Sequence, residues 1–347
     1  MIRGFRVEGM RLASVPPAQF IPETSGRLSP ETPSLDTDYS AAVAALRQMT
    51  WIDIEAPTHA EESLVEAALG FGIPTREDMQ EIEPSSRIYF EDGVLYLTAQ
   101  ILASPDMKAL GIGPVTFMIQ PERLVTVHYH RPGSFAFFAD WAARHDTPCE
   151  TGIATFLGLM EAVVDRLADI LENESRRLDD LSKTIFDSRK AASDALQGMV
   201  SRIGESEDRN GKISESLATL QRLLGFLSVG GMPGAKSILK GLNRDQLKSL
   251  THDVRSLREV AQVQSEKVRF QLDATLGVIN IRQSDIIKVF SVVAFVFLPP
   301  TLIASIYGMN FEYMPELAIR WGYPVALVMM VVSAVVPWLI FRWKKWL

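Results

Sequence analysis

Two long uncharged apolar runs near the C-terminus constrain this chain more than any other feature. No charged side chain lies between Lys288 and Glu312, and none lies between Arg320 and Arg342. Each gap exceeds the ~20 apolar residues that a helix needs to cross the hydrocarbon core of a bilayer. One such run also fits a buried helix of a soluble protein, but two so close together predict a membrane hairpin. Its expected parts are a first span over 289–310, a loop over 311–320 and a second span over 321–342.

The basic residues predict how this hairpin is oriented. Arg282 and Lys288 precede the first span, and Arg342 and the basic tail 343–347 follow the second. The loop has only one basic residue, Arg320. Since basic flanks stay in the cytoplasm, we expect an inner-membrane protein with both termini inside and the loop outside.

The composition of the rest of the chain predicts a large cytoplasmic domain. The net charge is −7, yet residues 285–347 hold five basic and only three acidic side chains, so the acidic excess lies before them. Such a domain would not seek nucleic acid, but it could attract cations. The single cysteine, Cys149, excludes an intramolecular disulfide, and we see no signal peptide in the first ten residues.

Residues 1–150 predict an α/β domain. Short stretches of apolar-polar alternation predict strands, and turn residues between them predict two hairpins. Pro57-Thr58 marks a helix start, and residues 16–38, rich in Pro, Ser and Thr, predict a loop with little regular structure. The strand segments are 51–54, 94–97 and 124–127, and the turns are 91–93 and 120–122.

From residue 151 the pattern becomes helical. Residues 151–240 predict a helical hairpin, with helices over 152–187 and 194–227 and a stop at the glycine-rich segment 230–234. A single helix is then predicted over 243–307, on the order of 100 Å long. Its part within 241–288 would be a stalk that joins the cytoplasmic domain to the first span and can transmit movement.

An acidic face on the first long helix allows two interpretations. Glu161, Asp165, Asp169 and Glu172 recur at helical spacing. They form either an ordinary solvated face or a surface that concentrates cations. Histidines near acids elsewhere, as in His252-Asp253, are more simply explained as exposed helix positions. The pair His128 and His130 lies on one strand face without an evident third ligand.

The segment that closes the first span is the most informative. Tyr307-Gly308-Met309-Asn310 lies where the chain leaves the bilayer, followed by the acidic Glu312 and Glu316. A glycine there permits a backbone conformation barred to other residues and ends the helix. On position alone, a helix cap followed by a polar loop remains a sufficient explanation.

This segment resembles the signature of the CorA family of magnesium transporters, Gly-Met-Asn at the end of the first of two C-terminal spans. The similarity extends to Leu298-Pro299-Pro300-Thr301, to Met314-Pro315-Glu316-Leu317 and to the closing Lys344-Lys345-Trp346-Leu347. The domain order also fits: an α+β cytoplasmic domain, long helices and a two-helix transmembrane hairpin. The resemblance implies a homopentameric channel that imports Mg²⁺, and also Co²⁺ and Ni²⁺.

The resemblance also implies roles for particular residues. Asn310 would form a ring of five amides at the outer mouth that holds hydrated Mg²⁺, and Gly308 and Met309 would shape that mouth. Glu312 and Glu316 would raise the local cation concentration. The pore-lining positions, from the mouth towards the cytoplasm, would be Thr301, Leu298, Ser291, Phe290, Ile287, Ser284 and Asp273.

Regulation is implied as well. In the family, Mg²⁺ bound between neighbouring cytoplasmic domains is held to keep the pore shut. Pro299-Pro300 is expected to kink the first span and to mark where it bends on gating. The candidate regulatory ligands are Asp92, Asp179, Asp180 and Asp253, without an assigned pair.

Three alternatives compete with the magnesium channel. A zinc-transport branch shares the superfamily, although it usually departs from Gly-Met-Asn at the middle residue, so Met309 favours Mg²⁺. A two-span membrane sensor without transport would leave Asn310 and Thr301 without a role. An enzyme is the weakest alternative, since the sequence has no phosphate loop, nucleophile elbow or His-Glu metal motif.

Overall fold

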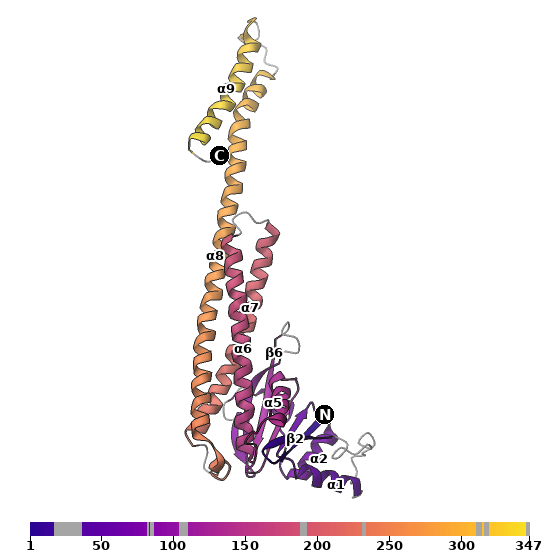
Figure 1. Cartoon of the computed structure of the whole chain (residues 1–347). Coiled ribbons are helices and arrows are strands. Elements are labelled where there is room, and N and C mark those ends of the chain that lie inside the picture. Colours follow the sequence, from indigo (N-terminus) through magenta and orange to yellow (C-terminus); the bar gives the residue numbers. More distant parts are fainter. Residues whose placement is uncertain are drawn as a thin grey trace. The chain divides into compact units, whose positions relative to one another are not determined.

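The computed structural model divides into two compact units (Figure 1), which we describe separately. The first comprises Met1–Thr184 and Ser201–Arg269, and the second comprises Ile185–Val200 and Phe270–Leu347. The segments predicted from the sequence are continuous stretches of chain. Each of the two units, by contrast, combines parts of several of these segments. The structure describes residues 1–16, 37–81, 83, 87–103, 110–187, 193–230, 234–309, 314–315 and 319–344.

A seven-stranded mixed sheet forms the base of the first unit. The strand order is β2-β1-β3-β7-β6-β5-β4, and every neighbouring pair is antiparallel except β3 and β7, which run parallel. The predicted strands at 51–54, 94–97 and 124–127 and both predicted hairpin turns are confirmed. The strands are β1 (Ile2–Glu8), β2 (Arg11–Val15), β3 (Trp51–Glu55), β4 (Ile88–Glu91), β5 (Val94–Ala103), β6 (Gly111–Ile119) and β7 (Leu124–His128).

Helices cover both faces of this sheet, because its strands alternate apolar side chains to either side. On β3, Trp51 belongs to the core shared with α5 and α6, whereas the next residue, Ile52, belongs to the core shared with α1 and α2. Burial of both faces explains why several strands are nearly continuous in apolar residues. The helices concerned are α1 (Thr37–Leu46), α2 (His59–Leu69), the short α3 (Arg76–Gln80), α5 (Gly133–Arg144) and α6 (Gly152–Asp187).

The predicted helix start at Pro57-Thr58 is confirmed. The Thr58 hydroxyl accepts a hydrogen bond from the Glu61 backbone N–H, and the Glu61 carboxylate accepts one from the Thr58 backbone N–H. This reciprocal capping box satisfies two amide donors that the first turn of α2 would otherwise leave unpaired. The predicted loop over 16–38 lies mostly outside the described residues, and α1 begins within it at Thr37.

Parts of three long helices complete the first unit, and there they pack along one another through polar as well as apolar contacts (Figure 1). Gln264 of α8 donates to the Leu171 carbonyl of α6 at 3.0 Å, and Asn210 of α7 donates to the Ala261 carbonyl of α8 at 2.9 Å. The predicted helices over 152–187 and 194–227 are confirmed. The further bounds are α7 (Ser193–Ser228), a 3-10 turn (Ile238–Gly241) and α8 (Arg244–Tyr307).

The second unit contains the two apolar runs as helices. They lie in the C-terminal part of α8 and in α9 (Gly322–Trp343), and both helices are long and apolar enough to cross a membrane. Only 6% of the most apolar stretch of each helix is buried within the chain. Phe295 of α8 contacts Phe341 of α9 with ring centroids 5.8 Å apart. Pro299 and Pro300 lie inside α8, as expected, and Pro337 lies inside α9.

A buried ion-pair network ties three strands of the first unit together. Asp53 of β3 is fully buried and forms an ion pair with Arg3 of β1. The carboxylate also accepts hydrogen bonds from the Thr126 hydroxyl at 2.6 Å and from His128 Nε2 at 2.9 Å, both on β7. Trp51 Nε1 donates to the Thr126 hydroxyl at 3.1 Å. Burial alone would raise the pKa of Asp53, but His128, Arg3 and Thr126 together hold it below its usual 3.8.

We predict that replacing this carboxylate destabilises the first unit. Asp53→Asn keeps the shape but removes the negative charge that pairs with Arg3, and because Arg3 is 35% exposed we expect a loss below the ~3–5 kcal/mol of a fully buried pair. Since the folded-state pKa is depressed, the stabilisation is complete above pH 3.8 and is lost as the pH falls below that value. The purified protein should therefore show a lower melting temperature with Asp53→Asn, and the gap should narrow towards pH 3. Exposed Asp140→Asn is the control, and an equal effect of both substitutions would contradict the assignment.

Candidate functional site

The C-terminal part of α8 has one face that packs within the chain. Val292 is buried, and Val296, Ile303 and Tyr307 are half-buried, at spacings of four, seven and four residues. This spacing defines a single stripe on a helix. Ile303 also lines a shallow apolar depression with Val328, Val332 and other residues of α9. The stripe is therefore the contact surface between the two candidate spans.

The predicted pore-lining residues lie on the other side of α8. Thr301 comes nine residues after Val292, which at ~100° per residue places it about half a turn around the helix. Leu298 and Ile287 fall near the same side by the same count. The exposed fractions of the side chains agree with this placement, since Phe290 is 71% and Leu298 65% exposed. Ser291 is the exception and is half-buried. Ser284 and Asp273, further towards the N-terminus of α8, are exposed as well.

The Thr301 hydroxyl is held by its own helix. It donates to the Phe297 carbonyl one turn earlier at 2.7 Å, which uses its proton and leaves the oxygen lone pairs free to accept. A hydrated cation presents water O–H groups outwards, so an acceptor is the kind of group that can contact its hydration shell.

One polar residue of this face was missed by the sequence-based prediction. Ser305 lies one turn beyond Thr301 and is exposed. The two hydroxyls are therefore neighbours on the same side of α8. The i, i+4 spacing from Thr301 was the signal that could have identified it.

The end of the first span lies close to where the sequence predicted it. α8 ends at Tyr307, and the backbone N–H groups of Gly308 and Met309 donate to the carbonyls of Ala304 and Ile306 at 3.0 and 3.2 Å. The conformational reason for the glycine was wrong, because the φ angle of Gly308 is not positive. A Cβ there would instead lie 3.1 Å from the Ala304 carbonyl oxygen, a close contact. Asn310, Glu312 and Glu316 lie outside the described residues.

The four candidate regulatory acids are all at the surface, and three have partners close by. Asp179 pairs with Lys267 of α8, and this pairing holds the pKa of Asp179 below its usual range. Asp180 lies 3.4 Å from Lys183, and Asp253 lies 3.7 Å from His252. Asp92 occupies the β4–β5 turn, where its φ is +48°. In the part of the chain that the structure describes, no three His, Cys, Asp or Glu side chains are grouped as a metal site would require.

The two histidines, His128 at the end of β7 and His130 just after it, have structural partners. His128 is buried against Asp53, and Nε2 of His130 lies 3.0 Å from the Ile101 carbonyl. Burial, together with the neighbouring His128, lowers the pKa of His130 from its usual 6.5 to about 4. A neutral imidazole in this environment packs the segment after β7 against β5 and β6.

Comparison with known proteins identifies the family. The model of the CorA-like Mg²⁺ transporter protein family matches residues 47–345, which include both apolar helices and the segment between them. The chain belongs to this family. It is 34% identical over 297 residues to the magnesium transport proteins CorA of Pectobacterium atrosepticum and of Escherichia coli K12, covering 86% of this chain and 92% of each relative.

Two solved structures share the fold. The complete structure of the CorA magnesium transporter from Methanocaldococcus jannaschii matches with a TM-score of 0.72 at 16% identity, over 100% of this chain and 99% of that one. The full-length CmaX protein matches with a TM-score of 0.65 at 12% identity, over 99% and 97% of the two chains. The predicted α+β domain, long helices and two-helix hairpin are thus the architecture of the CorA family.

Proposed function

We propose that this CorA-family chain forms a homopentameric channel that imports Mg²⁺, and also Co²⁺ and Ni²⁺, across the inner membrane. The observation that carries the proposal is the 34% identity to magnesium transport proteins over 297 residues, a stretch that covers most of the chain. Both termini would lie in the cytoplasm, because basic residues flank the spans and the connection carries one basic residue.

A pathway for ions requires several copies of the chain. One α8 helix presents a face to an ion but cannot enclose it, and this face has no apolar partner within the described chain. Five copies arranged around an axis would turn each residue of that face into a ring. The same face could instead contact lipid. Lipid contact, however, would not explain why this face carries the hydroxyls of Ser291, Thr301 and Ser305.

The polar side chains that five copies would repeat around the pore suit a hydrated ion. Mg²⁺ loses its water reluctantly, so a selective ring must contact the water shell rather than the metal. Amide oxygens of Asn310 and hydroxyl oxygens of Thr301 would accept hydrogen bonds from that shell. Neutral acceptors bind weakly enough to allow release, whereas the carboxylates Glu312 and Glu316 would act by attracting cations to the mouth. Gly308 and Met309 would shape the mouth around Asn310.

Apolar rings would close the pathway. Leu298, Phe290 and Ile287 are large and exposed in the single chain, at successive levels of α8. Rings of such side chains can block conduction by expelling water from the pore. Ser284 and Asp273 would line the cytoplasmic end, where a ring of Asp273 carboxylates would collect or release ions.

Cytoplasmic Mg²⁺ would regulate the channel by binding between neighbouring copies. Asp92 and Asp253 are the better candidates for this role, since Asp179 and Asp180 already lie beside lysines of the same chain. Binding to two copies at once would favour a symmetric arrangement of the cytoplasmic domains and a closed pore.

The decisive experiment measures ion entry into liposomes that contain the purified protein. We expect Mg²⁺ entry without proton coupling, and we expect Asn310→Ala to abolish it, because the amide ring at the mouth is lost. Size-exclusion chromatography should show an unchanged oligomer for the variant. Glu207→Gln, an exposed carboxylate on α7, serves as the control. Normal Mg²⁺ entry with Asn310→Ala would refute the ring, and proton-driven Zn²⁺ uptake would assign the protein to the zinc branch.

A second prediction addresses the apolar gate. Leu298→Asn places a polar amide at an apolar ring, so the closed pore should stay hydrated and leak. We expect the basal Mg²⁺ flux at high internal Mg²⁺ to rise about tenfold. Val293→Asn, an exposed residue on another side of the same helix, should not produce this leak. Equal basal flux in Leu298→Asn and the unmodified protein would exclude Leu298 from the gate.

A further inference from the structure

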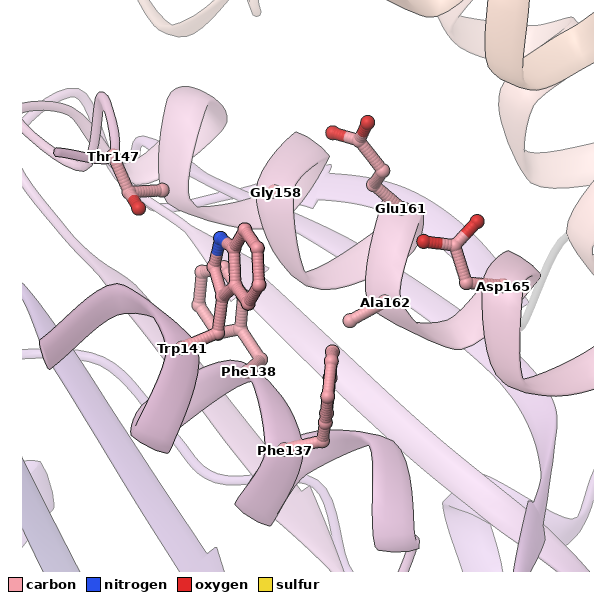
Figure 2. Close-up of a pocket in the computed structure, with 8 residues that line it drawn as sticks. All are labelled: Phe137, Phe138, Trp141, Thr147, Gly158, Glu161, Ala162 and Asp165. Carbon is pink, nitrogen blue, oxygen red and sulfur yellow. The ribbon is translucent and has the colours of Figure 1, made fainter. Parts of the chain in front are cut away.

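A cavity in the first unit lies apart from the proposed ion pathway. Its volume is about 250 Å³, and it opens between α5 and α6 (Figure 2). One side is aromatic and the other carries carboxylates, a combination that neither the packing of the sheet nor the ion pathway requires. The lining residues are Phe137, Phe138, Trp141, Thr147, Gly158, Glu161, Ala162 and Asp165.

Exposed aromatic rings form the α5 side. Phe137 is 57% exposed and Trp141 47% exposed, and their rings are nearly parallel with centroids 6.2 Å apart. His145 stacks on the Trp141 ring at 3.7 Å and so holds the indole in place. Phe138 is buried beneath them, and it fits because Gly158 lacks a side chain: a Cβ there would lie 2.9 Å from the Phe138 ring. Large aromatic surfaces left open to solvent beside a cavity are typical of binding sites.

Carboxylates form the α6 side. Glu161 and Asp165 lie one helical turn apart, and in Figure 2 both extend from α6 at the edge of the cavity. The Glu161 carboxylate accepts a hydrogen bond from the Gln246 side chain at 3.0 Å. No lysine or arginine of the described chain forms an ion pair with either carboxylate. The cavity therefore has negative charge that the described residues of this chain do not neutralise.

The carboxylates repel one another. Partial burial raises the pKa of Asp165, and the charges of Glu161, Asp169 and Asp253 raise it further. A cation at the cavity would relieve this repulsion. Of the acidic face predicted from the sequence, Glu161 and Asp165 line the cavity, and the charges of Asp169 on α6 and Asp253 on α8 act on Asp165 from outside it.

The two sides together select the kind of cation. Aromatic faces attract cations, most strongly those that are weakly hydrated. A guanidinium is planar, stacks on aromatic rings and offers paired N–H donors that match a carboxylate. Mg²⁺ keeps its water shell and would gain little from contact with the aromatic rings. We propose that this cavity binds a small molecule with an alkylguanidinium group, which contacts Phe137 and Trp141 and donates hydrogen bonds to Glu161 and Asp165.

The cavity size favours a free small molecule over a protein segment. Its ~250 Å³ lies just below the range of drug-sized ligand sites, so it accommodates a guanidinium with a short aliphatic chain. Agmatine has this composition and serves as the probe. Putrescine is its matched control, because it has the same four-carbon chain and total charge with an ammonium in place of the guanidinium.

Isothermal titration of the full chain in detergent, at constant Mg²⁺, tests the proposal. We expect agmatine to bind and putrescine to bind at least about fivefold more weakly. Trp141→Leu and Asp165→Asn should each weaken agmatine binding about tenfold, which corresponds to the loss of one stacking or one charge-assisted contact. Glu172→Gln removes a carboxylate from the same exposed face of α6 outside the cavity and should leave agmatine binding unchanged.

Each other outcome overturns the proposal. Absence of agmatine binding to the unmodified chain, or equal binding of agmatine and putrescine, would exclude a guanidinium site. Unchanged affinity in both Trp141→Leu and Phe137→Leu, with circular dichroism showing folded proteins, would exclude the aromatic side. If Glu172→Gln and Asp165→Asn weaken agmatine binding equally, the effect is one of overall charge and not of the cavity. If added Mg²⁺ displaces agmatine, the carboxylates bind the metal instead.

Discussion

Most apolar side chains on the C-terminal part of α8 and on α9 are exposed in the part of the chain that the structure describes. Phe290, Phe297, Leu298 and Val328 are each more than 60% exposed. Water would penalise this surface at roughly 25 cal/mol per Å², so it requires lipid or other copies of the chain. Lipid in turn demands that every backbone polar group be paired internally, which an α-helix achieves by itself. The helical form of both runs, and the family's assembly in membranes, follow from this one constraint.

The same helix serves a different environment before residue 270. There α8 buries Leu247, Leu250, Val254 and Ala261 at spacings of three, four and seven, which is the pattern of a helix with one partner face. Its polar residues there also have partners, as the bonds of Gln264 to α6 and of Asn210 to α8 show. A helix anchored in this way cannot rotate independently of α6 and α7. Its N-terminal part is therefore suited to carry a change in the first unit as a rigid element.

Sequence periodicity predicted most of the architecture, because helices, hairpin turns and uncharged spans are local patterns. The buried network around Asp53 could not be predicted in this way. Its members come from residues 3, 53, 126 and 128, and they meet only through strand pairings that the sequence does not state. The cavity between α5 and α6 could not be predicted for the same reason. The spacing of the acidic residues on α6 was visible in the sequence, but the aromatic rings come from α5, whose position beside α6 was not. Gly308 was expected to adopt a special backbone angle, yet its φ is not positive, and a Cβ there would lie close to the Ala304 carbonyl oxygen.

The hydroxyls on α8 bear on how a channel of this kind could select its ion. Thr301 already uses its proton within the helix, so its oxygen can act only as an acceptor towards the pathway. An acceptor of this type cannot distinguish a bare cation by tight coordination, but it can recognise outward-facing O–H groups of a complete water shell. Ser305, one turn away, would add a second acceptor level. Successive weak contacts of this kind, rather than one strong carboxylate site, would let a small and strongly hydrated ion pass without losing its water.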